Sequence, residues 1–178
     1  MKLHLFGASG TGVSTLGAAL AEALGIPYLD SDTYFWEATD PPFTVRRAAD
    51  ARDARLAADL ARHPHWILGG SLLGWGGDWR GAFDGAVFLW LPTALRLQRL
   101  RRRELLRYGS VIETDPVRCA RHEAFMAWAA GYDDGSAGGH RTLANHEGWL
   151  RELRCPVLEL RQDWSVDERV AAVLGVIR

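Results

Sequence analysis

Residues 7–15, GASGTGVST, decide how the rest of the chain is interpreted. The stretch has the spacing of a phosphate-binding loop, G-x-x-x-x-G-K-[ST], in which backbone N–H groups surround phosphate oxygens. It departs from that pattern at one position, because Val13 stands where the pattern has lysine. A decayed loop and a chance run of small residues are the alternatives. The apolar run before the loop and the amphipathic helix predicted after it supply the context that the motif requires.

The loop contains the groups that a phosphate site uses. Gly7, Gly10 and Gly12 permit left-handed backbone angles and a close approach of the ligand. The helix after the loop adds unpaired N–H groups and the positive end of its dipole, and Ser14 stands where the pattern places a Mg²⁺ ligand. We therefore predict that nucleotide phosphates contact the whole loop, which consists of Gly7, Ala8, Ser9, Gly10, Thr11, Gly12, Val13, Ser14 and Thr15.

Val13 removes the charged side chain that reaches the β- and γ-phosphates in other loops of this type. Losing one charged hydrogen-bond donor costs about 1.5–3 kcal/mol of binding, and losing one transition-state donor lowers the rate by about 10²–10³. The backbone N–H groups do not depend on side chains, so an arginine from elsewhere in the chain can restore the charge. The chain has one lysine, Lys2, so lysine is scarce throughout the sequence. This general scarcity does not by itself explain why valine stands at position 13.

Predicted strands and helices alternate along the chain. Short apolar runs predict strands, at residues 2–6, 26–30, 65–70, 85–92 and 155–160. Apolar periodicity and end signals predict helices, at residues 13–25, 45–64, 93–109, 116–131, 143–153 and 165–178. This alternation predicts an α/β fold in which helices cover both faces of a parallel sheet. We expect a single domain over residues 1–178 that includes an arginine-rich helix and lid region at about 96–141.

Bulk composition excludes several classes of protein. With 178 residues and a net charge of −1, the chain suits one domain and has no overall attraction to nucleic acid or anionic lipid. No apolar run approaches the roughly 18 residues of a membrane span, and the start of the chain is not a signal peptide. Cys119 and Cys155 are expected to be free thiols. We expect a cytoplasmic monomer or dimer without a nucleic-acid or membrane partner.

The helix predicted over 93–109 is the main cationic feature of the chain. Its arginines are Arg96, Arg99, Arg101, Arg102, Arg103 and Arg107. Spacings of three and four put Arg96, Arg99, Arg103 and Arg107 on one face, and the helix starts at the sheet edge where α/β proteins bind ligands. We predict that one or two of these arginines contact phosphate, with Arg99 and Arg103 catalytic and Arg102 nucleotide-binding. A solvated basic face and a nucleic-acid patch are the alternatives.

Two carboxylates follow the second predicted strand. Asp30 and Asp32 alternate along an extended segment, so both side chains are expected to face one site. We predict both as catalytic, since one can accept the proton of an attacking hydroxyl and the other can hold Mg²⁺. For the metal we choose Asp32 together with Ser14. The alternative is a strand-end turn in which Asp serves as a cap.

A third group of residues is predicted to bind the phosphoryl acceptor. Glycines at a strand end let a ligand meet the backbone closely, and tryptophans on nearby loops can stack on a planar molecule. The predicted acceptor residues are Trp36, Arg46, Gly69, Gly70, Ser71 and Trp75. Core packing of the tryptophans and a surface position of the arginine are the alternatives. Residues 132–141 are interpreted as a mobile lid carrying Arg141 or as a simple surface loop.

Together these residues resemble the P-loop small-molecule kinase family, which includes adenylate kinase, shikimate kinase and gluconate kinase. The resemblance spans nearly the whole chain and rests on residues 7–15, Asp30-x-Asp32, Gly69-Gly70 and the arginine helix from Arg96. More narrowly, the chain resembles a bacterial group of adenylate kinase-like proteins, often labelled ATPases, whose loop reads close to GASGSGTTTLG and lacks the lysine.

The resemblance implies a three-layer fold with a five-stranded parallel sheet in the order 2-3-1-4-5. It implies that Asp30-Ser31-Asp32 serves metal and acceptor, and that Arg99 with Arg102 or Arg103 clamps phosphates under a lid. The expected activity is transfer of the γ-phosphoryl group of Mg-ATP to a small molecule such as a nucleoside or nucleotide. A nucleotide-binding regulator or weak NTPase is the first alternative, because Val13 favours it. A polynucleotide-binding protein is the second.

Overall fold

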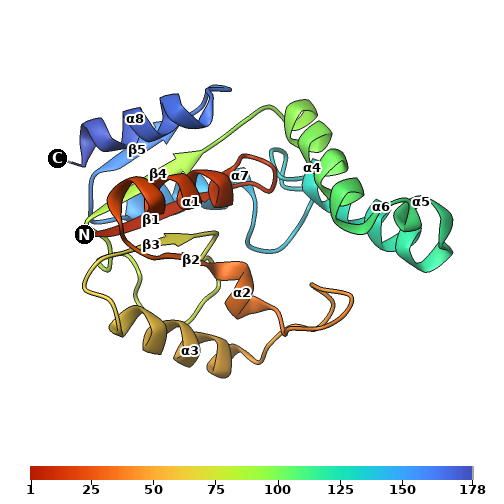
Figure 1. The fold of residues 1–178 in the computed structure, drawn as a ribbon, viewed down its shortest axis with the longest axis horizontal. Coiled ribbons are helices and arrows are strands. Elements are labelled where there is room, and N and C mark those ends of the chain that lie inside the picture. Colours follow the sequence, from red (N-terminus) through yellow and green to blue (C-terminus); the bar gives the residue numbers. More distant parts are fainter. Residues whose placement is uncertain (178) are drawn as a thin grey trace.

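Five parallel strands form one sheet in the order β2-β3-β1-β4-β5 in the computed structural model, which describes residues 1–177 (Figure 1). The strands are β1 (Lys2–Gly7), β2 (Tyr28–Asp30), β3 (Trp66–Gly69), β4 (Gly85–Leu89) and β5 (Val157–Leu160). β1 is central, and its Leu5 lies beside Gly69 of β3 and Val87 of β4. The predicted fold class and strand order are therefore confirmed.

Alternation of side chains along β1 gives the sheet two apolar faces. Leu3 and Leu5 point into a cluster with residues of α1 and α8, whereas Phe6 joins the opposite cluster with residues of α3 and α7. The helices are α1 (Val13–Leu24), α2 (Ser31–Phe35), α3 (Ala49–Ala61), α4 (Thr93–Tyr108), α5 (Val111–Thr114), α6 (Pro116–Ala130), α7 (Leu143–Glu152) and α8 (Val166–Val176). The sheet is thus the middle of three layers, as Figure 1 shows.

Three local features differ from the sequence prediction. The helix predicted over 45–64 begins only at Ala49, and Arg46 instead forms an isolated antiparallel bridge with Trp36. The helices α2 and α5 were not predicted because each is shorter than two turns and shows no apolar period. Residue 178, the end of the last predicted helix, lies outside the described residues.

Helices α4, α5 and α6 extend from one side of the sheet and form a separate arm in Figure 1. The contacts of α4 with α6 and of α5 with α6 hold the arm together. Leu100 of α4 packs there against Met126 and Ala129 of α6 in a small apolar cluster. Within residues 1–177, no helix has the length and apolar character that crossing a membrane requires.

Candidate functional site

The loop at residues 7–15 connects the carboxyl end of β1 to α1, and its glycines are required by the packing around them. Gly10 and Gly12 have φ angles of 87° and 96°. A Cβ on Gly7 would lie 2.2 Å from the carbonyl oxygen of Leu89, and one on Gly10 would lie 2.8 Å from that of Arg96. The loop is therefore enclosed between the end of β4 and the start of α4, and larger residues at these glycine positions would displace it.

The first turn of α1 leaves donors available at this loop. Gly12 is the N-cap residue, and no side chain among residues 1–177 caps the helix. The loop holds its own shape through Thr11, whose hydroxyl donates a hydrogen bond to the Ala8 carbonyl at 2.8 Å. Uncapped N–H groups at a helix N-terminus form an anion-binding surface. The side chain of Val13 packs against the α1–α8 face of the core, so this position gives the loop no charge.

Ser14 and Asp30 meet directly beside the loop. The Ser14 hydroxyl donates to Asp30 Oδ2 at 2.7 Å, and the phenol of Tyr28 donates to the same oxygen at 2.9 Å. The backbone N–H of Asp32 donates to the other carboxylate oxygen at 3.0 Å. Burial, and then the negative charge of Asp30, raise the pKa of Tyr28. The phenol therefore remains a donor that orients this carboxylate.

Ser14 contacts Asp30 and not Asp32, so the role of Asp32 as a metal ligand stays a prediction. β2 ends at Asp30 and α2 begins at Ser31, so the backbone turns between the two carboxylates. The alternation of an extended strand, on which the prediction rested, does not continue to Asp32. The Asp32 carboxylate instead accepts a hydrogen bond from Arg141 at 3.3 Å.

The Ser14–Asp30 pair fits a magnesium ion. Mg²⁺ prefers oxygen ligands and is often held by one or two side chains together with substrate phosphates and water. A hydroxyl and a carboxylate oxygen 2.7 Å apart at the phosphate-binding loop match that ligand set. Among residues 1–177 there is no group of three or more His, Cys, Asp or Glu side chains that would hold a metal ion without a substrate.

Three arginines surround the ring of Phe35, next to Asp32. The guanidinium carbons of Arg46, Arg52 and Arg141 lie 5.7, 5.9 and 5.8 Å from the ring centroid. We call Arg46, Arg52 and Arg141 the arginine cluster. They come from the segment before α3, from α3 itself and from the segment before α7. The fold thus gathers three cations at the carboxyl edge of β2 and β3, beside the Asp32 carboxylate.

Other predicted acceptor residues occupy more enclosed positions. Trp75 is buried and stacks on the guanidinium of Arg52 at 4.1 Å. A Cβ on Gly70 would lie 1.8 Å from Ser31 Oγ, and one on Gly69 would lie 2.1 Å from the Tyr28 hydroxyl, so the two glycines let the β2–α2 turn and the Tyr28 side chain approach β3. These glycines support the turn that carries the two carboxylates, and Trp36 is half-buried beside the arginine cluster. Acceptor contact by these residues stays a prediction.

Ser71 takes part in a buried hydrogen-bond chain. The Ser71 hydroxyl and His146 Nε2 are 3.0 Å apart, and His146 Nδ1 is 2.7 Å from the Tyr132 hydroxyl. Burial, and then the charge of Arg141, lower the pKa of His146 to about 3, so the ring is neutral. The chain connects the segment after β3 to the segment after α6.

The arginines of α4 do not share one exposed face. Arg96 is fully buried, so its predicted place on that face was wrong. Its guanidinium donates to the carbonyls of Leu91 and Ala129 at 3.0 and 3.1 Å, and to Thr93 Oγ1 and Asp133 Oδ2 at 3.0 and 3.2 Å. It cannot reach a phosphate, because α4 packs this side against α6 and the segment after it.

The remaining arginines of this helix have other surroundings. Arg103 and Arg107 pair with Glu104 at 3.1 and 3.7 Å. Arg99 pairs with Asp163 in the segment between β5 and α8, and Arg102 is exposed. Arg99 therefore contacts the segment that follows β5, whereas Arg103 and Arg107 form ion pairs within α4. Phosphate contact by Arg99, Arg102 and Arg103 stays a prediction.

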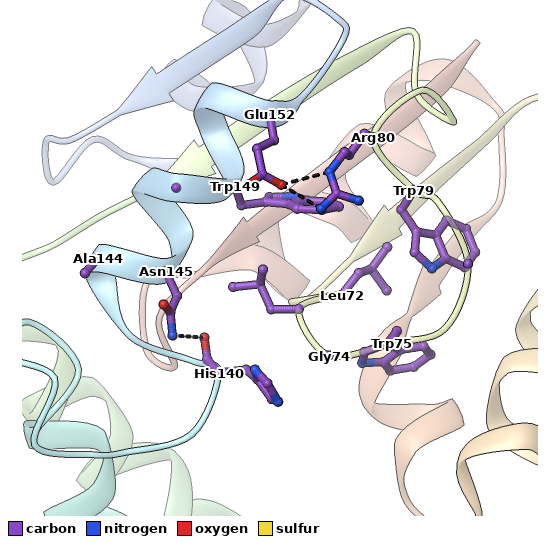
Figure 2. Close-up of a pocket in the computed structure, with 13 residues that line it drawn as sticks. Leu72, Gly74, Trp75, Trp79, Arg80, His140, Ala144, Asn145, Trp149 and Glu152 are labelled. Carbon is purple, nitrogen blue, oxygen red and sulfur yellow. Dashed lines mark hydrogen bonds and ion pairs between the residues drawn. The ribbon is translucent and has the colours of Figure 1, made fainter.

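A cavity of about 340 Å³ adjoins this region, between the segment after β3 and α7 (Figure 2). Trp75, Trp79 and Trp149 are among its lining residues, and Arg80 pairs with Glu152 across it at 2.8 Å. Trp75 belongs both to this cavity and to the contact with Arg52 of the arginine cluster. The cavity therefore lies next to the arginine cluster without including Asp32 or the loop.

Comparison with known proteins places the chain in a family. No family model matches it. It is 42% identical over 177 residues to the uncharacterized protein YqaC of Bacillus subtilis (strain 168), and the match covers 99% of this chain and 97% of the relative. The chain belongs to the YqaC family. The matched region covers nearly the whole chain and therefore includes the segments that form the candidate site.

Comparison with solved structures shows which fold this chain has. A shikimate kinase from Bacteroides thetaiotaomicron has a TM-score of 0.59 at 17% identity, covering 99% of this chain and 98% of that one. A deoxyadenosine kinase from M. mycoides has a TM-score of 0.53 at 13% identity, with 98% and 97% coverage. The predicted resemblance is confirmed: this YqaC-family protein has the fold of the P-loop small-molecule kinases.

Sequence reasoning missed Arg52 and Arg169. Arg52 lies within the helix predicted over 45–64 and was given no role there, and only the structure shows that it is buried between Phe35 and Trp75. Arg169 follows a capping box at the start of α8 and donates to the carbonyl of Thr11 at 2.7 Å. A buried arginine at the fourth position of a helix with a polar start gives no signal in the sequence.

Proposed function

We propose that this protein is a phosphotransferase that moves the γ-phosphoryl group of Mg-ATP to a hydroxyl group of a small anionic molecule. The observation that carries the proposal is the contact between Ser14 and Asp30 at 2.7 Å, beside the loop and the uncapped N-terminus of α1. A hydroxyl and a carboxylate positioned at such a loop are what a magnesium-bound triphosphate needs.

The nucleotide end of the site consists of residues 7–15, whose backbone N–H groups and helix N-terminus would hold the phosphates. Ser14 and Asp30 would hold Mg²⁺, which neutralises charge that develops on the phosphate oxygens. Tyr28 keeps Asp30 in place through the hydrogen bond at 2.9 Å. Catalysis by such a site is mainly positioning and electrostatic stabilisation.

The acceptor end is centred on Asp32. Its carboxylate would take the proton of the acceptor hydroxyl while that oxygen bonds to the γ-phosphorus and the bond to the β-phosphate oxygen breaks, releasing ADP. The arginine cluster supports an anionic acceptor. Among the described residues its three cations have two carboxylate partners, Asp32 for Arg141 and Asp53 for Arg52. A carboxylate or phosphate group on the acceptor would balance the remaining charge. A nucleotide or a hydroxylated carboxylate has both required groups.

A nucleotide-binding regulator with little or no turnover is the second candidate. The observation that favours it is Val13, whose side chain packs on the apolar core and leaves the position of the usual lysine without charge. The two candidates share the nucleotide end of the site and differ at the acceptor end. Only the phosphotransferase needs Asp32 as a proton acceptor.

The test is a screen for γ-phosphoryl transfer from Mg-ATP to nucleosides, nucleotides and hydroxylated carboxylates, followed by mass spectrometry of the products. We expect transfer to an anionic acceptor, with Asp32→Asn lowering kcat by about 10²–10⁴ as for other general bases. Arg141→Met should raise KM for the acceptor. ATP binding without transfer to any acceptor would support the regulator, and an Asp32→Asn variant of undiminished activity would remove Asp32 from the mechanism.

A further inference from the structure

Arg169, on the last helix of the described chain, reaches back to the phosphate-binding loop. Its Nη1 donates to the carbonyl oxygen of Thr11 at 2.7 Å, across 158 positions of sequence. The same nitrogen lies 3.0 Å from where a Cβ on Gly12 would be. The side chain is buried, with a relative exposure of 5%. A guanidinium thus lies against the loop backbone next to Val13.

One donor of the Arg169 guanidinium, its Nε, is buried without a partner among the described residues. Arginine carries five N–H donors, and the contact with Thr11 uses one of them. The nearest Asp163 carboxylate oxygen is 3.7 Å from Nη2, which is too long for a hydrogen bond. Buried charged donors without partners are costly, so the arrangement favours an additional anion.

The charges around Arg169 point the same way. Asp163 is shared, because Arg99 of α4 also pairs with it. Two guanidiniums therefore have one carboxylate between them, and that carboxylate is exposed to water. Burial, and then the positive charge of Arg99, lower the pKa of Arg169. The surroundings of this cation are deficient in negative charge on the side of the loop.

We propose that Arg169 is the cation that neutralises nucleotide phosphates on the 7–15 loop, in place of the lysine that is absent at position 13. The inference rests on the proposed nucleotide site and adds to it the residue that completes it. Arg96 is excluded from this role because carbonyls and Asp133 occupy its guanidinium. Arg103 is paired with Glu104 on its own helix. Arg169 combines contact with the loop and a buried donor without a partner in the described chain.

The first experiment is a calorimetric titration of Mg-ATP into the wild-type protein, Arg169→Met and Arg62→Met. Arg62 is exposed at the end of α3 and pairs only with the neighbouring Asp59 among the described residues, so it controls for the loss of one positive charge. We expect Arg169→Met to weaken binding by about 10- to 100-fold, the usual effect of a charged donor. Arg62→Met should bind as the wild type does.

A lysine introduced at position 13 distinguishes a charge role of Arg169 from a structural role. Val13→Lys should restore at least tenfold of the affinity lost in Arg169→Met, because the new ammonium replaces the missing positive charge. Lysine at this position cannot replace the hydrogen bond to the Thr11 carbonyl. A variant pair in which Val13→Lys gives no recovery would therefore overturn the proposal and leave Arg169 as a support for the loop.

Two shorter probes locate the contact on the nucleotide. Inorganic tripolyphosphate should lose affinity for Arg169→Met by the same factor as ATP, whereas adenosine should lose none. The opposite result would overturn the proposal, since it would place Arg169 at the nucleoside.

Asp163→Asn provides an independent test that leaves Arg169 in place. Removing the competing carboxylate should tighten Mg-ATP binding about threefold to tenfold, and weaker binding would contradict the charge argument.

The outcomes distinguish the two proposals. Wild-type binding of Mg-ATP that Arg169→Met leaves unchanged would overturn the role of Arg169 and leave the phosphotransferase standing. An absence of Mg-ATP binding by the wild type would overturn both. Thermal unfolding of each variant without ligand shows that a loss of binding is not a loss of fold.

Discussion

Arg96 and Arg169 are both buried arginines beside the phosphate-binding loop, and they differ in what surrounds the guanidinium. Arg96 donates to two carbonyls, a hydroxyl and a carboxylate. Arg169 donates to one carbonyl and has a buried Nε without a partner in the described chain. The first residue has the environment of a structural cation, because its donors are used within the protein. The second has the environment of a cation whose partner is a ligand.

The largest expected difference is in stability without ligand. Arg96→Met should lower the free energy of unfolding by about 3–5 kcal/mol, because it removes the ion pair with Asp133 and the hydrogen bonds to two carbonyls. Arg169→Met should change it by less than about 1 kcal/mol, since it removes one hydrogen bond and also one poorly compensated buried charge. Urea denaturation measures both. Equal losses would mean that Arg169 is a structural arginine too.

A second difference concerns the stabilisation that ATP provides. At an ATP concentration 100 times the wild-type Kd, the wild type should gain about 2.7 kcal/mol of stability. Arg96→Met should show the same gain over its own lower baseline. Arg169→Met, with binding weakened 10- to 100-fold, should gain only about 0.4–1.4 kcal/mol. Thermal shifts with and without Mg-ATP test this, and a full gain in Arg169→Met would break the comparison.

The buried histidines differ from both arginines, because burial keeps their rings neutral. Burial lowers the pKa of His4 to about 4 and that of His146 to about 3. Both values lie below the unfolded value of about 6.5, so the unfolded chain binds more protons between these limits. Stability is therefore fully present above about pH 6.5 and falls as the pH decreases towards 4.

His146→Gln checks this sign. The variant should flatten the decrease of stability below pH 6.5 by up to about 1.4 kcal/mol per pH unit. Its hydrogen bonds with Ser71 and Tyr132 will be weakened at every pH. A variant whose stability falls as steeply as that of the wild type would show that His146 is not the group that titrates.

Local patterns were enough to predict the fold. The apolar runs, the glycine loop and the helix end signals each depend on neighbouring residues, and the observed sheet order agrees with the resemblance that they support. The glycines of residues 7–15 occupy the positions that the motif requires, with positive φ at Gly10 and Gly12. Such features are encoded within about ten residues and can therefore be recognised in a sequence.

The site could be predicted only in part, because its decisive contacts depend on where elements end and how distant elements pack. Because β2 stops at Asp30, the hydrogen-bond partner of Ser14 is Asp30, whereas the sequence had predicted Asp32 beside it. The approach of α3 to the segment after β3 buried Arg52 on Trp75. Arg169 belongs to a helix that is remote in sequence from the loop, so no local pattern connects the two.

The order in which the chain is made gives the contact between Arg169 and Thr11 a further meaning. The ribosome adds Arg169 158 positions after Thr11 of the loop. A nascent chain that has finished β5 can already pair all five strands, and its loop can take up its glycine-dependent shape. It still lacks the guanidinium beside that loop. If Arg169 has the role proposed above, the full affinity for nucleotide phosphates would be reached only when α8 docks beside the loop.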